Sequence, residues 1–148
     1  MKRFLLVGTI LFCAAVVAIL AEIVRRSFFE KPGSPSHLKR IALQINEREW
    51  ETNEDSVVVP VSAQAGDRRL TMQYELLTAS AAEVDDVTRR EVREVMRRGA
   101  CEKDAFRELL DAGVTLQYVI NDSDGAPVLS TEVLRWECGG GLSAPSSR

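Results

Sequence analysis

The stretch from Cys101 to Cys138 constrains the fold of this chain more than any other segment, because several successive signals in it agree. Apolar residues recur at helical spacing and stop before a glycine that suits a left-handed helix end, and two strand patterns then flank an Asp-Gly turn. In order, these signals predict a helix over residues 101–110, a stop at Gly113, a strand over 114–121, a turn over 122–125 and a strand from Val128 to about Trp136. We therefore expect a closed helix-hairpin unit with a cysteine at each end.

The two end cysteines, Cys101 and Cys138, are predicted to form a disulfide. Closing a loop of this length stabilises a chain by about 4 kcal/mol on the chain-entropy estimate, a large share of a small domain's stability. The alternative is two independent buried thiols. The bracketing positions favour the bond, because it would join the helix start to the strand end, and disulfides suit an exported domain. Cys13 is outside this pair, in an apolar run where it packs or faces lipid.

An N-terminal apolar run predicts that the chain meets a membrane. Residues 4–21 carry no charge and are just long enough to cross a bilayer before Arg25 and Arg26 close the span. A cleaved signal peptide needs small residues before the cut, which the run offers only weakly. A lipoprotein signal would have to use Cys13, but Phe12 precedes it where such signals carry a small residue. We therefore predict an uncleaved transmembrane signal anchor over residues 1–26.

Basic residues flank the apolar run on both sides, so charge alone does not decide its orientation. Lys2 and Arg3 favour a cytoplasmic N-terminus, and Arg25 and Arg26 compete with them. The cysteine pair decides the prediction, because a stable disulfide indicates an oxidising compartment. We expect the folded body to lie outside the cytoplasm. The alternatives are a cleaved chain that leaves the membrane and a body that faces the cytoplasm.

Composition divides the remaining chain into a linker, one domain and a tail. Residues 27–37 include a Pro-Gly-Ser-Pro sequence and are predicted to be a linker. The only histidine, His37, falls in it and is expected to be an exposed side chain rather than a metal or catalytic group. Residues 38–138 are expected to form one α+β globular domain, and residues 139–148 a disordered tail.

The first half of the domain is expected to add strands and a long helix. Residues 38–46 fit neither period cleanly, and we predict a strand, with a short helix as the alternative. The β-branched run 57–61 contains Pro60, which indicates an edge strand or a bulge, and residues 70–76 alternate as its hairpin partner. A capping-box pattern over residues 80–83 then opens a helix. The expected fold is an antiparallel sheet of four to five strands with two consecutive helices on one face, preceded by one N-terminal transmembrane helix.

Two surfaces are candidates for binding a partner. The first is an arginine-rich helix face with Arg89, Arg93 and Arg97, which would suit an acidic partner or lipid headgroups. Acids stand four residues before several arginines of this helix, so a solvated, internally paired face is the simpler interpretation. The second is the edge strand with Pro60, through strand addition. The formal net charge of −3 gives no reason to expect nucleic acid as a partner.

No motif in the chain has the arrangement that catalysis or cofactor binding needs. A nucleophilic mechanism requires a base held by the fold, and the single histidine is in the predicted linker. The sequence from Asn121 to Gly125 looks like a calcium loop, but the alignment puts Thr131 where a bidentate Glu belongs. The glycines at 139–141 have no helix after them, so they are not a phosphate loop. We therefore expect no catalytic, cofactor or metal site, and a protein that is not an enzyme.

The stretch from Phe106 to Cys138 resembles a group of small bacterial membrane-anchored envelope proteins. The residues that carry the resemblance are Leu109-Leu110, Gly113-Val114, Tyr118, Asp124-Gly125 and Cys138. It implies an α+β fold and a bacterial envelope location, here the inner membrane with the domain in the periplasm, and it transfers no functional residue. The general plan is also similar to secretion-system pilotins, which are typically lipid-anchored; Phe12 before Cys13 departs from that pattern.

Two functions of different classes are compatible with these features. The preferred hypothesis is a single-span envelope protein without enzymatic activity, which binds another envelope protein or supports assembly of an envelope complex. The alternative is a small membrane-tethered hydrolase or lipid-modifying enzyme that uses a carboxylate pair. That alternative requires two acids to converge in a pocket with perturbed pKa values. The partner's identity and the oligomeric state are left open.

Overall fold

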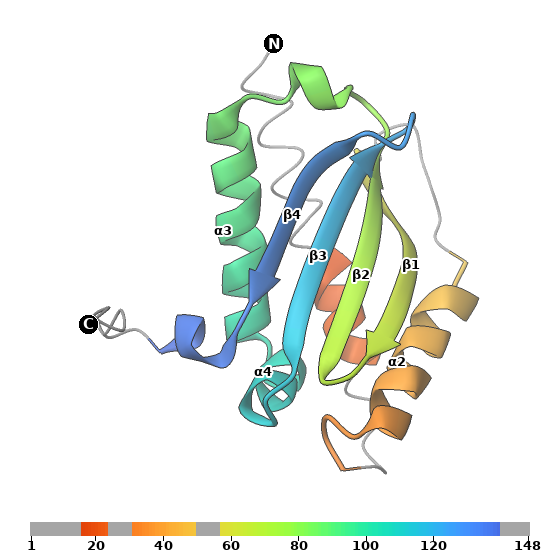
Figure 1. The fold of residues 1–148 in the computed structure, drawn as a ribbon, viewed down its shortest axis with the longest axis vertical. Coiled ribbons are helices and arrows are strands. Elements are labelled where there is room, and N and C mark those ends of the chain that lie inside the picture. Colours follow the sequence, from red (N-terminus) through yellow and green to blue (C-terminus); the bar gives the residue numbers. More distant parts are fainter. Residues whose placement is uncertain (1–15, 24–30, 50–56, 140–148) are drawn as a thin grey trace.

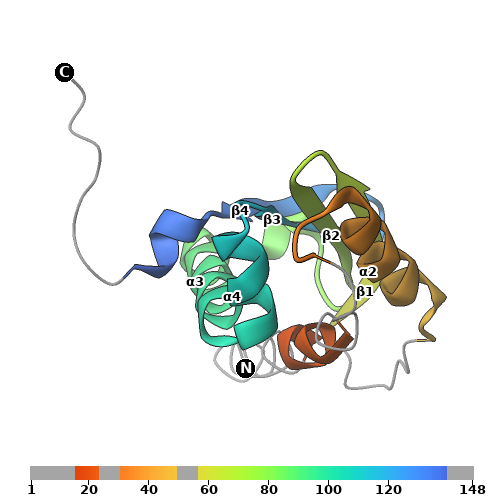
Figure 2. The ribbon, with the colours of Figure 1, turned by 90° about the horizontal axis from the view of Figure 1, so that it is seen from below.

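One four-stranded sheet, with helices on a single face and along one edge, forms the body of the protein (Figures 1 and 2). The structure, a computed structural model, describes residues 16–23, 31–49 and 57–139. The described elements are, in chain order, a helix over residues 16–23, α2 (Pro35–Glu47), β1 (Val58–Gly66), β2 (Arg69–Leu76), the 3₁₀ turn η1 (Ala81–Glu83), α3 (Asp86–Glu102), α4 (Asp104–Asp111), β3 (Thr115–Asp122), β4 (Pro127–Val133) and the 3₁₀ turn η2 (Arg135–Cys138). The α+β class and the four strands are confirmed.

The sheet is mixed, and the prediction of an antiparallel sheet is wrong for its central pair. The strand order is β1-β2-β3-β4, with antiparallel pairs at both ends and a parallel pair of β2 and β3 in the middle. Helices α3 and α4 connect the end of β2 to the start of β3. A helical crossover of this kind returns the chain to the end at which the previous strand began, so the next strand runs parallel to it.

The two faces of the sheet differ in polarity, as the alternating patterns predict. Tyr74 and Leu116 are buried on the helix side, and the rings of Tyr74 and Tyr118 stack with their centroids 6.3 Å apart. The other face is polar, and on it Thr71 Oγ1 donates a hydrogen bond of 2.9 Å to Gln117 Oε1 across the parallel pair. The strand register therefore places the predicted apolar side chains in the core.

Helix α2 corrects two predictions. Residues 38–46, predicted as a strand, are helical, and the helix already begins at Pro35, inside the predicted linker 27–37. Ser34 Oγ accepts a hydrogen bond from the backbone N–H of His37 (3.2 Å), and Pro35 suits the first turn because it needs no donor there. The side chains at i, i+3, i+4 and i+7 then form one buried face: Leu38, Ile41, Ala42 and Ile45.

His37 is buried in the first turn of α2, so the prediction of an exposed linker side chain is also wrong. Its Nδ1 accepts a hydrogen bond of 3.2 Å from the backbone N–H of Gly33. The imidazole thereby ties the turn before α2 to the helix itself. This contact is structural.

The boundaries of α3 and α4 differ from those predicted. Glu83 Oε2 accepts hydrogen bonds from both the backbone N–H and the hydroxyl of Ser80, but this box closes only the short turn η1. Helix α3 begins afterwards, with Asp85 Oδ1 accepting from the backbone N–H of Thr88 (2.8 Å). At its other end α3 includes Cys101, which was predicted to start the next helix. Gly113 then ends α4 with a φ of 81°, as predicted.

The helix of residues 16–23, which we call the core helix, packs inside the domain. Five of its side chains are buried in the same apolar cluster as the sheet and the other helices: Val16, Val17, Leu20, Ala21 and Ile23. No helix among the described residues is long and apolar enough to cross a membrane. The rest of the predicted anchor 1–26 and almost all of the predicted tail 139–148 lie outside the described residues, so both remain predictions.

Candidate protein-interaction site

An apolar pocket of about 330 Å³ opens between the N-terminal half of α3 and one end of the sheet. All four strands contribute to it, since Val58, Leu76, Ile120 and Leu129 lie near the strand ends that meet there, and Val92 of α3 faces them. A concave, mainly aliphatic site with a few polar groups at its margin is typical of a binding site. The sequence did not predict this pocket, because its lining comes from segments far apart along the chain.

The polar side chains at the margin of the pocket form hydrogen bonds with backbone groups. Glu83 closes η1 and Asp85 caps α3, as described above, and Arg89 Nη2 donates a hydrogen bond of 2.8 Å to the backbone carbonyl of Ala81. The hydrogen bonds from Ser80 lower the pKa of the Glu83 carboxyl below its usual value. These three side chains therefore shape the mouth of the pocket.

This margin does not provide the carboxylate pair that the enzyme hypothesis requires. Glu83 and Asp85 both line the pocket, but each accepts hydrogen bonds from backbone N–H groups. A general acid needs a raised pKa, whereas the pKa of Glu83 is lowered. Within residues 16–23, 31–49 and 57–139, no group of three His, Cys, Asp or Glu side chains is arranged to hold a metal ion.

The three arginines of the predicted surface lie along α3 but have different environments. Arg89 is partly buried at the pocket, and its Nη1 lies 3.6 Å from Asp86 Oδ1. Arg97 pairs with Glu94 and donates a hydrogen bond of 3.0 Å from Nη1 to the backbone carbonyl of Glu137. Arg93 is exposed, with no hydrogen bond or ion pair to the part of the chain that the structure describes. The ion pairs of Arg89 with Asp86 and of Arg97 with Glu94 have i,i+3 spacing, whereas the prediction named i,i+4 pairs.

These contacts predict that Arg97 and Arg93 respond differently to the same substitution. Arg97→Gln should lower the free energy of unfolding by about 1 kcal/mol, because it removes the Glu94 pair and the bond to η2. Arg93→Gln should change it by less than about 0.5 kcal/mol, as expected for an exposed side chain without partners. Urea unfolding of both variants measures the difference, and equal losses would contradict the assignment.

Pro60 lies on edge strand β1, at a register irregularity between Pro60 and Ser62, as its sequence suggested. Its side chain is buried, and the structure does not bring it to the arginine face of α3. The edge of β1 is also partly occupied. Asn46 of α2 donates to the carbonyl of Ala63 (2.9 Å) and accepts from its N–H (2.6 Å), as a neighbouring strand would. This contact opposes strand addition at that point of β1.

Asp122 is a buried carboxylate that sequence reasoning treated only as part of a turn. Its Oδ1 accepts hydrogen bonds from the backbone N–H groups of Ala126 (2.7 Å) and Asp124 (3.1 Å), and its Oδ2 accepts from Ala81 (2.8 Å). The turn pattern could not predict the hydrogen bond from Ala81, because this bond joins the β3-β4 hairpin to the loop before α3. Asp122 thus fixes one wall of the pocket.

Replacement of this carboxylate predicts a pH-dependent loss of stability. The hydrogen bond from Ala81, followed by that from Ala126, lowers the pKa of Asp122, so the stabilisation is present above about pH 4 and is lost as the pH falls through the folded-state pKa. Asp122→Asn should lower the melting temperature at pH 7 by about 5 °C or more, because its amide N–H₂ would face the N–H of Ala81. Calorimetry from pH 7 to pH 3 should show the difference in melting temperature between wild type and Asp122→Asn decreasing as the pH falls.

Asp124→Asn is the matched control for this measurement. Asp124 is exposed in the same turn, and only its backbone N–H takes part in the contact. The control should have the same melting temperature as the wild type at every pH. A constant gap between wild type and Asp122→Asn across the pH range would show that the charge of Asp122 is not the stabilising feature.

The disulfide lies at the opposite end of α3 from the pocket. Cys101 and Cys138 are joined, with their Cα atoms 5.1 Å apart, so the bond attaches the end of α3 to η2. The bond from Arg97 to Glu137 supports the same junction. This end of the molecule is therefore held covalently, whereas the pocket end is held by hydrogen bonds.

Comparison with known proteins identifies the fold. No protein-family model and no curated protein sequence matches the chain. Among solved structures, a Pseudomonas aeruginosa protein thought to be secreted superposes with a TM-score of 0.60 at 17% identity, over 70% of this chain and 91% of its own. The pilotin EpsS of the Vibrio vulnificus type 2 secretion system superposes with a TM-score of 0.56 at 13% identity, over 81% and 98% of the two chains. The Vibrio cholerae type II secretion system pilotin AspS superposes with a TM-score of 0.53 at 13% identity, over 80% of this chain and 97% of its own. The chain therefore shares the fold of these three proteins.

Proposed function

We propose that this chain is a non-enzymatic envelope protein that binds another envelope protein and supports assembly of a secretion-type complex. The observation that carries the proposal is the fold shared with two type II secretion pilotins over about four fifths of the chain. The pocket beside α3 supplies a concave apolar surface that suits a protein side chain or short segment. The two carboxylates at its margin are engaged with the backbone, which agrees with binding rather than catalysis.

The location that fits this function is the periplasmic side of a bacterial inner membrane. The Cys101–Cys138 disulfide favours an oxidising compartment, and the apolar run over residues 4–21 favours attachment to the membrane through one span. These two features bear on the location of the protein and not on the identity of its partner. The partner would approach the pocket end of α3, past the exposed Arg93.

Filling the pocket tests the proposal. Val84 lines the pocket, so Val84→Trp should occupy it without disturbing the core beyond it. Val87 lies on the exposed surface of α3 and does not line the pocket, so Val87→Trp adds the same side chain outside it. In native membranes, crosslinking followed by mass spectrometry should show the wild-type complex retained in Val87→Trp and reduced at least tenfold in Val84→Trp.

Two outcomes would contradict different parts of the proposal. If the wild-type protein crosslinks to no envelope protein, the assembly role fails. If both tryptophan variants are folded by circular dichroism and retain the complex equally, the role stands but the pocket is not the binding surface. Crosslinking of the Arg93→Gln variant at increasing salt concentration then distinguishes the contribution of charge to partner binding from the contribution of apolar contacts.

A further inference from the structure

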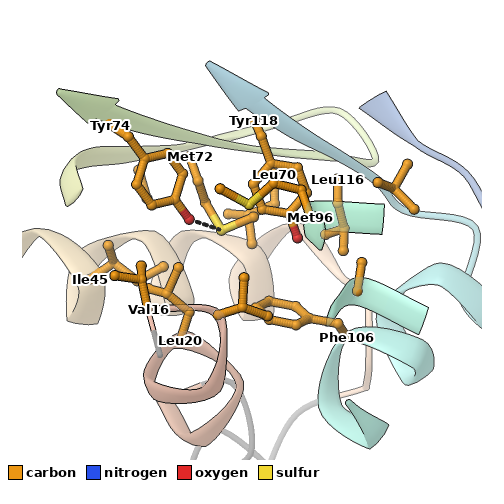
Figure 3. Close-up of a cluster of buried hydrophobic side chains, with 14 of the residues drawn as sticks. Val16, Leu20, Ile45, Leu70, Met72, Tyr74, Met96, Phe106, Leu116 and Tyr118 are labelled. Atoms are coloured by element: carbon orange, nitrogen blue, oxygen red, sulfur yellow. Dashed lines mark hydrogen bonds between the residues drawn. The ribbon is translucent and has the colours of Figure 1, made fainter. Parts of the chain in front are cut away.

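The core helix packs against the rest of the domain through apolar side chains, as a bound helix of another chain would. Figure 3 shows Val16 and Leu20 beneath the sheet, with Ile45 of α2 and Phe106 of α4 to either side and Met72 above. Leu20 is fully buried, and Val17 is 1% exposed. We call the surface formed by Ile45, Met72, Gly99 and Phe106 the helix-binding surface, because it receives this helix.

Gly99 makes a close approach of the core helix to α3 possible. A Cβ atom at this position would lie 2.6 Å from Val17 Cγ1, closer than real contacts permit, and 3.3 Å from Val17 Cβ. Glycine inside a helix costs about 1 kcal/mol relative to alanine, so its presence here needs a packing reason. Small residues at such crossings let two helices pack at short distance. The glycine therefore adapts α3 to an apolar helix lying across it.

The core helix cannot occupy this surface and span a bilayer at the same time. The uncharged run covers residues 4–21, and its last six residues belong to the core helix. Residues 4–15 would remain, and twelve residues in a helix cover about 18 Å, whereas the hydrocarbon core is about 30 Å thick. The membrane span predicted from the sequence and the packing observed in the structure thus exclude each other.

We propose that the core helix is a detachable occupant of the helix-binding surface, which leaves it when the N-terminal run enters a bilayer and thereby opens it to one apolar helix of a protein partner. Both locations remove the side chains of the core helix from water, but detachment also uncovers the helix-binding surface, which a partner helix would bury again. The proposal rests on the proposed assembly function, and it adds to the pocket beside α3 a second contact surface, the kind of helix that binds there and the event that opens it.

The packed residues of the core helix define the chemistry of that partner. They occupy positions i, i+1, i+4, i+5 and i+7: Val16, Val17, Leu20, Ala21 and Ile23. A partner helix would present two turns of aliphatic side chains at this spacing, with a residue no larger than valine where it crosses Gly99. Helices of this kind bind by lying in an apolar depression with several side chains as anchors.

A cysteine pair reports where the core helix lies. In full-length protein that also carries Cys13→Ser, Val17→Cys and Gly99→Cys bring two β-carbons to a separation close to that of a disulfide. Oxidation should join them at least fivefold more completely in protein without lipid than in phosphatidylethanolamine–phosphatidylglycerol vesicles. The matched control pairs Val17→Cys with Arg93→Cys, because Arg93 is exposed on α3 and leaves Gly99 unchanged, so this pair should not crosslink in either condition. Equal yields from the first pair with and without lipid would overturn the proposal.

A peptide experiment tests whether the vacated surface accepts a helix. The probe is a labelled synthetic peptide of residues 14–26 of this chain, added to full-length protein. Val17→Trp should expel the chain's own helix, because the indole cannot fit at Gly99, while the helix-binding surface itself is unchanged. The peptide should bind this variant at least tenfold more tightly than wild type, whose surface is already occupied. Ala18→Trp, which adds the same side chain at the exposed position, should bind like wild type.

The outcomes separate this inference from the proposed function. Peptide affinity that is the same for Val17→Trp and wild type would overturn detachment, whether or not a natural partner exists. Tight peptide binding without any crosslinked partner in native membranes would leave the helix exchange intact and remove the assembly role. The cysteine pair keeps the inference testable if Val17→Trp does not fold.

Discussion

Replacing both Cys101 and Cys138 by alanine should lower the free energy of unfolding by about 4 kcal/mol and the melting temperature by about 15–30 °C. The two cysteines are 37 residues apart in the sequence, and removing the bond frees that loop in the unfolded chain. In the folded chain the same bond attaches η2 to α3, and Arg97 also donates a hydrogen bond to the backbone carbonyl of Glu137 there. Thermal and urea unfolding of the oxidised protein and the double variant measure the effect.

The single variants are the control for this prediction. If the bond itself stabilises, Cys101→Ala, Cys138→Ala and the double variant should all lose nearly the same stability, because either change removes the whole bond. Additive losses would instead indicate two separately packed thiols. A double variant that melts within a few degrees of wild type would contradict the loop-closure argument.

Deleting residues 1–23 should lower the free energy of unfolding by about 3–5 kcal/mol, the range expected when a well-packed core site is emptied. The deletion removes the five buried side chains of the core helix and uncovers Phe106, Ile45 and Met72. Binding of the dye ANS should rise, because this apolar surface becomes accessible to water. Urea unfolding and ANS fluorescence in lipid-free protein measure the two effects.

Deletion of residues 1–15 provides the matched comparison, because it keeps the core helix and every buried residue that the structure describes. This shorter deletion should unfold within about 1 kcal/mol of the full chain. If both deletions are as stable as the full chain, the core helix contributes nothing to the fold in solution. That result would also remove the basis for helix exchange.

Local patterns were sufficient for most strands and turns of this protein. Residues 70–76 alternate strictly, and residues 114–121 alternate except at Val119. A one-residue slip would have buried glutamines instead of Tyr74 and Tyr118, so the faces of both strands were predictable. Gly113 was predictable for a related reason, since a left-handed helix end accepts few other residues. In these segments the signal and the structure depend on the same neighbours in the chain.

Helix α2 shows where a local pattern becomes ambiguous. Ile41, Leu43 and Ile45 alternate like a strand, but Ile41 and Ile45 also fit a helix with Leu38. In the structure Leu43 is 55% exposed, so the helical pattern is the one that packs. The decision depends on β1, whose edge receives Asn46 from α2 and which lies beyond the local window.

The candidate site was less predictable than the fold. The arginine face was visible from helical spacing, but spacing could not show that Arg89 and Arg97 bind backbone carbonyls whereas Arg93 binds none among the described residues. The pocket was invisible, because it exists only where the ends of four strands meet α3. The parallel pairing of β2 and β3 was not predictable either, because the path of α3 and α4 beneath the sheet determines at which end of the sheet β3 starts.

The sequence alone determined the disulfide-bracketed unit, the polarity of the sheet faces and the apolar character of residues 4–21, because each depends on composition or on neighbours in the chain. Only the tertiary structure decided where the end of that apolar run lies. A bilayer and a protein core both remove Val17 and Leu20 from water, so hydrophobicity cannot distinguish the two. The close fit of Val17 against Gly99, beside Phe106, is a contact between distant segments, and it places the core helix in the domain.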